Sequence, residues 1–162
     1  MSEGGITADA CDTLIDAYAA IGAEGSSAHV ARRACFSCLS LLLDFNPGNF
    51  GAIRRIDSNA WRVAPIYDYD GSFGFPFNGV SISYLCENPL LVELLCAQRF
   101  SFLKSSWDWS WCDLRALDGF ENAIMKAYAS YRSLPPVFAE LIAHLFVTQC
   151  DYVNKVASGE WA

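Results

Sequence analysis

Residues 51–68 read GAIRRIDSNAWRVAPIYD, and this stretch determines how the middle of the chain folds. Two short runs that favour β-structure, 52–56 and 61–66, lie on either side of Asp57, Ser58 and Asn59, which favour a turn. The pattern predicts a β-hairpin. Because a tight hairpin returns the chain to its starting point, the residues just before it and just after it are expected to lie close together.

Side chains with oxygen atoms border the predicted hairpin. Asp44 and Asn49 precede it, in LLLDFNPGNF (residues 41–50), and Asp68 follows it. Carboxylate and amide oxygens suit Mg²⁺, which usually takes one or two protein carboxylates and leaves positions for phosphate and water. A separate carboxylate can accept the proton of an attacking hydroxyl. These three residues therefore predict a phosphoryl-transfer site, with Asp70 either assisting the metal or building a DYDG turn.

This part of the chain resembles the HipA-like serine/threonine kinases. Their catalytic loop is similar to D-x-H-x-x-N-F-G, and a later A-P-x-[YF]-D supplies a second acid. The chain has DFNPGNFG at residues 44–51 and APIYDYDGSFG at residues 64–74, and the resemblance is best over residues 30–75. It implies that Asp44 is the catalytic base and that Asn49 and Asp68 hold the Mg²⁺ that bridges the ATP phosphates. The implied phosphoryl acceptor is a protein hydroxyl.

The sequence departs from this family in two places. Asn46 stands where the loop of the family has a histidine. Neither a glycine-rich phosphate loop nor a strand lysine precedes Asp44, and the first lysine is Lys104. The kinase N-lobe is therefore expected to be absent, so that the chain alone binds ATP weakly and needs an N-lobe or partner chain.

Two alternatives share these residues. The triplet from Pro47 to Asn49 also resembles the D-x-H-P-G-N loop of aminoglycoside-phosphotransferase-like kinases, whose acceptors are small molecules. A non-catalytic, pseudokinase-like module that binds another protein would keep the same residues as relics.

The rest of the chain predicts helices. Apolar residues recur at helical spacing over 8–21 and 27–43, and further helices are expected from 88–89 onward, over 118–132 and from 135 to about 157. Thr7 or Asp9 is expected to cap the first helix, and Asn88 the third. The predicted fold is a single, mainly α domain over residues 1–162, similar to a kinase C-lobe, with a small β-hairpin that carries the site.

Composition limits the partners of this chain. Hydrophobic residues make up 53% of the 162 residues, which is enough for a sizeable core. The net charge of −7, without a run of Lys or Arg, predicts no nucleic-acid partner. The longest apolar stretch is far short of the ~20 residues that span a bilayer, and the N-terminus does not look like a signal peptide. A cytoplasmic location is expected.

The cysteines and the tryptophans favour structural roles. An odd number of cysteines, seven, without a secretion signal predicts reduced and mostly buried thiols. Cys35 and Cys38 lack the second pair that a zinc site needs, so we predict that both pack in the core. Trp107, Trp109 and Trp111 alternate along SWDWSW and are expected to pack in the core as well, with an exposed binding surface as the alternative.

Overall fold

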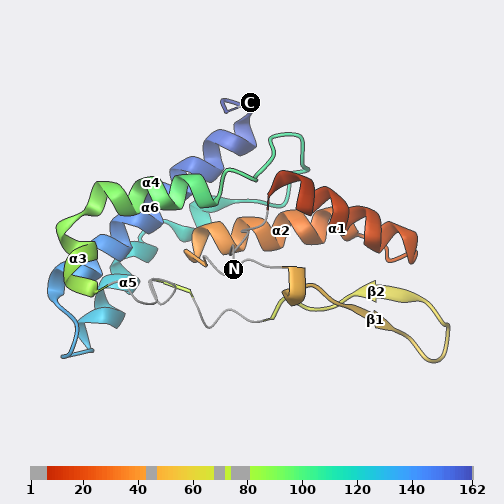
Figure 1. Cartoon of the computed structure of the whole chain (residues 1–162), viewed down its shortest axis with the longest axis horizontal. Coiled ribbons are helices and arrows are strands. Elements are labelled where there is room, and N and C mark those ends of the chain that lie inside the picture. The colour runs from red at the N-terminus through yellow and green to blue at the C-terminus, as the bar shows by residue number, and fades with distance from the viewer. Residues whose placement is uncertain (1–6, 43–46, 68–71, 74–80, 162) are drawn as a thin grey trace.

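The computed structural model describes residues 7–42, 47–67, 72–73 and 81–161. It is mainly helical with one small antiparallel sheet, as predicted. Three of the predicted site residues, Asp44, Asp68 and Asp70, lie outside the described residues. In Figure 1 the hairpin extends away from the C-terminal helices, on the side of the chain where the first two helices pair.

The first two helices, α1 (Ala8–Ala20) and α2 (Ser26–Leu39), pack against each other. Thr7 caps α1 as predicted, because its Oγ1 accepts a hydrogen bond of 3.3 Å from the Ala10 N–H. The turn after α1 contains Gly22 at φ +70°, a conformation that glycine adopts without steric cost.

The helix α2 ends four residues earlier than the sequence predicts. Leu41 has φ +56°, and the Leu42 N–H donates to the Ser37 carbonyl at 2.8 Å, which together close the helix in a Schellman-like turn. A left-handed leucine costs roughly 1–2 kcal/mol. Leu41 and Leu42 are almost completely buried, and burial of each is worth about 1.5–3 kcal/mol. Core packing therefore outweighs the strain of ending the helix here.

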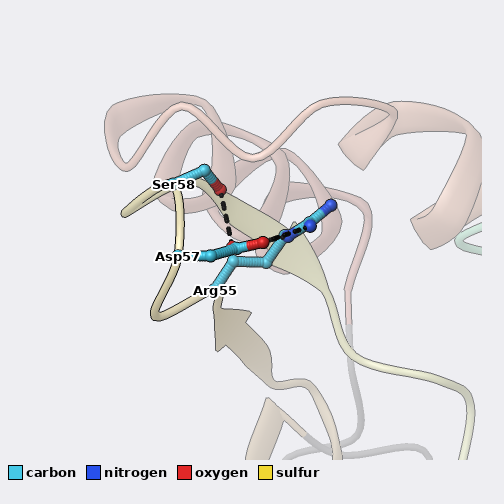
Figure 2. A network of polar contacts seen from close by, with 3 residues as sticks. All are labelled: Arg55, Asp57 and Ser58. Atoms are coloured by element: carbon cyan, nitrogen blue, oxygen red, sulfur yellow. Dashed lines mark hydrogen bonds and ion pairs between the residues drawn. The ribbon is translucent and has the colours of Figure 1, made fainter.

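The predicted hairpin is present. Strands β1 (Ala52–Arg54) and β2 (Trp61–Val63) pair antiparallel, with Ala52 opposite Val63 and Arg54 opposite Trp61. Both are shorter than expected. At the tip, Asn59 takes φ +57°, and the exposed Arg55 and Asp57 side chains form an ion pair of 2.6 Å (Figure 2). The turn residues read from the sequence thus set the position of the hairpin.

The C-terminal half is helical. It contains α3 (Ile82–Glu87), α4 (Pro89–Arg99), η2 (Leu114–Leu117), α5 (Phe120–Ala129) and α6 (Pro136–Ser158). The helix α4 begins at Pro89 with Asn88 at the N-cap position, as predicted, but the Asn88 side chain makes no capping hydrogen bond to α4. Its side chain donates instead to the Tyr84 carbonyl in α3 at 2.8 Å, because α3 ends directly before α4. The sequence did not predict α3.

The longest helix, α6, lies at the centre of the core. It packs against α5, α2 and α3, and its buried residues include Ile142 and Leu145. Trp107 and Trp109 are buried in the same core, which confirms their predicted packing. Within the described ranges, no helix combines the length and the apolar character that crossing a bilayer requires.

Candidate functional site

Asn49 is the one residue of the predicted trio that the structure describes. It ends the short 3₁₀ turn η1 (Pro47–Asn49), directly before the hairpin. The residue is 8% exposed, and its side-chain Nδ2 has no hydrogen-bond partner among the described residues. A buried amide without a partner is costly in free energy. Asn49 is therefore a buried polar residue rather than an exposed turn residue.

The two segments that flank the hairpin lie against each other. The Ala64 N–H donates to the Gly51 carbonyl at 2.8 Å, and the Tyr67 hydroxyl donates to the Gly48 carbonyl at 3.4 Å. A Cβ atom on Gly51 would lie only 3.4 Å from the Cβ of Ala64 and from the Tyr67 hydroxyl. The prediction that the hairpin brings its two ends together is therefore confirmed for residues 48–51 and 64–67.

A buried arginine lies beneath these flanks. Arg33, on α2, is 0% exposed, and its Cζ lies 4.6 Å from the ring centroid of Phe50 and 5.5 Å from that of Tyr67. Its Nη2 also donates to the Tyr67 carbonyl at 3.0 Å. Arg33 thus holds both ends of the hairpin against α2. Sequence reasoning missed this residue, and its only signal was an arginine on the buried face of a helix.

Two further side chains from the N-terminal helices complete the base of the hairpin. The Tyr18 hydroxyl, from α1, donates to the Gly51 carbonyl at 3.0 Å. The His29 ring packs edge-on against Tyr18 and Phe50, with centroid distances of 6.1 and 6.5 Å. Burial lowers the pKa of His29, and the positive charges of Arg33 and Arg32 lower it further. The imidazole is therefore neutral near pH 7.

This environment predicts how His29 titrates. Its midpoint, followed by NMR, is expected to lie below the ordinary value of about 6.5. The folded state then binds fewer protons than the unfolded state, so the His29 contribution to stability is present above pH ~6.5 and is lost as the pH falls toward the folded midpoint. Phe50→Ala should move the midpoint upward by exposing the ring. A wild-type midpoint at or above the ordinary value would contradict this account.

The carboxylate inside the hairpin belongs to its tip rather than to this site. Asp57 accepts hydrogen bonds from Arg55 and from the Ser58 hydroxyl, and the bond from Arg55 is the main reason that the pKa of Asp57 is lowered (Figure 2). In the part of the chain that the structure describes, no three His, Cys, Asp or Glu side chains are grouped to hold a metal ion. The predicted ligand Asp68 and the predicted base Asp44 lie outside that part, so both roles stay predictions.

The cysteines, His144 and Trp111, which the sequence also singled out, have the contacts of residues with structural roles. Cys35 and Cys38 are buried, and the Cys38 thiol donates to the Gln149 Oε1 at 3.0 Å. His144 is exposed and lies 2.6 Å from a carboxylate oxygen of Glu93. Trp111 is half-buried and stacks on Trp109.

Comparison of the chain with protein-family models, with curated proteins and with solved structures finds no significant match.

Proposed function

We propose that this chain is the catalytic lobe of an ATP- and Mg²⁺-dependent phosphotransferase, similar to the HipA-like protein serine/threonine kinases. The observation that carries the proposal is the contact between the two flanks of the hairpin. Tyr67, which immediately precedes Asp68 in the chain, donates to the Gly48 carbonyl, one residue before Asn49. A catalytic loop and a metal-binding acid need this kind of proximity to serve one phosphate group.

The residues present fit a magnesium ion in donor type. Asn49 offers a buried amide and Asp68 a carboxylate, which are the hard oxygen donors that Mg²⁺ prefers. Bound there, the ion would neutralise charge on the ATP phosphates. In the proposed reaction Asp44 accepts the proton of the acceptor hydroxyl as that oxygen attacks the γ-phosphorus. Arg33, Tyr18 and Tyr67 position the loop and do not touch the reacting atoms.

The experiment is a titration of ATP into the intact chain, with and without Mg²⁺, in three variants. Asp68→Asn removes the proposed metal ligand and Asp44→Asn removes the proposed base. Asp57→Asn is the matched control, since this carboxylate belongs to the same hairpin but lies at its exposed tip, paired with Arg55. We expect weak, Mg²⁺-dependent binding that falls about tenfold, or ~1.4 kcal/mol, in Asp68→Asn and is unchanged in Asp57→Asn.

Phosphoryl transfer to a protein that contains serine or threonine is then measured. For this assay a kinase N-lobe is supplied, either fused upstream of the chain or added as a separate chain. Asp44→Asn should abolish transfer while leaving Mg²⁺-dependent ATP binding nearly intact, because a catalytic base acts in the transition state. The proposal would be overturned if ATP bound equally well with and without Mg²⁺ and in the Asp44→Asn and Asp68→Asn variants. That result would favour the non-catalytic binding module. Transfer to a small molecule alone would favour the aminoglycoside-type alternative.

A further inference from the structure

The hairpin exposes both of its faces to solvent. Ile53 on one face is 38% exposed, Trp61 on the other is 36% exposed, and Ile56 beyond β1 is completely exposed. The two strands have three residues each, and a hairpin of two strands is only marginally stable by itself in water. Apolar side chains that it holds away from the core are available to a partner. The hairpin therefore has the form of a docking arm.

The hairpin is also a basic segment of an acidic chain. The whole chain carries a net charge of −7, whereas the hairpin, from the start of β1 to the end of β2, contains three arginines and a single acid, Asp57. Arg55 is paired with Asp57 (Figure 2). Arg54 and Arg62 are exposed on opposite faces, and the Arg54 Cζ lies 5.8 Å from the ring centroid of Trp61. Arginine and tryptophan are enriched among the residues that dominate binding energy at interfaces.

A cleft in the C-terminal half carries the opposite charge. Its volume is about 790 Å³, and it is lined by the loop before η2, by η2, by the start of α5 and by the second half of α6. Leu117 and Phe146 give it apolar surface. A cavity of this volume holds a ligand of drug size, so the side chains of a hairpin tip fit it in size. Four carboxylates and one arginine also line the cleft: Asp113, Asp118, Glu121, Asp151 and Arg115.

Most of the negative charge of this cleft is not neutralised by a neighbouring cation. Asp113 is paired, since the Arg115 Nε lies 2.8 Å from its carboxylate. The other three carboxylates have no ion-pair partner in the part of the chain that the structure describes. Burial is the main reason that the pKa of Cys150, on the cleft wall, is raised to about 11, and the surrounding carboxylates, Asp151 first among them, raise it further. The cleft therefore attracts positively charged groups.

We propose that the hairpin of one copy of this chain docks in the acidic cleft of a second copy. Figure 1 shows the hairpin extending away from α5 and α6, which hold much of the cleft, so the two surfaces meet between molecules rather than within one. Arg54 and Arg62 are attracted by the unpaired carboxylates, and Ile56 supplies apolar contact. Complementary charge speeds the encounter and fixes the register of such a pair. Because the two surfaces differ, the contact is heterologous.

The salt dependence of self-association is the first test. Sedimentation velocity of the intact chain, over a range of concentrations, should show association at low salt. At about 1 M salt, where charges are screened beyond about 3 Å, the dissociation constant should rise about tenfold or more. General repulsion between two chains of charge −7 predicts the opposite trend, because salt would then strengthen association. A chain that stays monomeric at low salt, or associates more tightly at high salt, refutes the proposal.

Two charge-reversed variants test which surfaces meet. The hairpin variant carries Arg54→Glu and Arg62→Glu, and the cleft variant carries Asp118→Lys and Asp151→Lys. In each variant alone the hairpin and the cleft have the same sign of charge, so self-association should weaken about tenfold or more. An equimolar mixture should associate again. In the mixture the acidic hairpin of one variant meets the basic cleft of the other, and the basic hairpin meets the acidic cleft.

Controls change the same kinds of charge elsewhere. Arg132→Glu and Glu140→Lys lie outside the hairpin and the cleft lining, and both should leave association unchanged. All the substituted residues are exposed, and circular dichroism checks that helical content is native. If both double variants associate like the wild type, the pairing is wrong. If the folded variants do not associate when mixed, the hairpin does not dock in this cleft. The salt dependence of the wild type is decisive even where a variant fails to fold.

Discussion

Leu145→Ala is expected to lower the free energy of unfolding by about 3–4 kcal/mol. Leu145 is 0% exposed on α6, the helix that packs against α5, α2 and α3. The substitution removes apolar surface that was buried and leaves a cavity that several helices surround, so the site can collapse only in part. Because a domain of this kind is stable by only about 5–15 kcal/mol, the urea midpoint should fall sharply with little change in the m-value.

Leu90→Ala makes the same chemical change on the surface. Leu90 is 72% exposed in the first turn of α4, and its replacement should alter the free energy of unfolding by no more than about 0.5 kcal/mol. Because both variants replace leucine with alanine, the difference between their losses of unfolding free energy measures the effect of burial. Equal losses in the two variants would mean that α6 is not the centre of the core.

The elements that local chemistry determines could be read from the sequence. The hairpin was predicted because its turn residues and its β-favouring runs lie within a few positions of one another. Likewise α6 begins after Pro135 and ends at Gly159, whose φ of +76° is a helix-ending conformation. Such signals act over one or two helical turns, and a single sequence displays them directly.

Elements that depend on distant contacts could not be read in this way. The early end of α2 follows from burial of Leu41 and Leu42, and the apolar run alone favours a longer helix. The short helix α3 was missed because the Asn88-Pro89 signal marks only the next helix. Its own signal was Ser81, whose Oγ accepts from the Tyr84 N–H at 3.1 Å. A serine that could cap a helix occurs often in sequences. Such a serine, followed by a helix of only six residues, is therefore not enough by itself to predict that helix.

The same division applies to the candidate site. The position of Asn49 beside the hairpin was predictable, since the hairpin itself is a local structure. The packing of Arg33 on Phe50 and Tyr67 joins residues 17 and 34 positions apart. No spacing rule links such positions. Only the docking of α2 against the base of the hairpin reveals them.

Arg33→Ala is expected to cost about 3 kcal/mol of unfolding free energy. The change removes a desolvated cation–π contact worth up to about 2 kcal/mol and a charged hydrogen bond to the Tyr67 carbonyl worth roughly 1.5–3 kcal/mol, while the emptied volume partly collapses. It should also release the hairpin from α2. The hairpin carries the exposed residues Arg54, Arg55 and Arg62, so trypsin should cleave it faster in the folded variant.

The neighbouring Arg32→Ala is the matched control. Arg32 is exposed and its Cζ lies 5.6 Å from the ring centroid of Trp111, so its loss should cost no more than about 1 kcal/mol and leave hairpin cleavage unchanged. Arg33→Lys keeps the charge but loses the planar group that stacks on the rings, so it should recover less than half of the lost stability. If Arg33→Ala destabilises the chain without accelerating hairpin cleavage, Arg33 supports the core alone. In that case its role in positioning the residues beside Asn49 is wrong, because the hairpin would keep its place on α2 without the arginine.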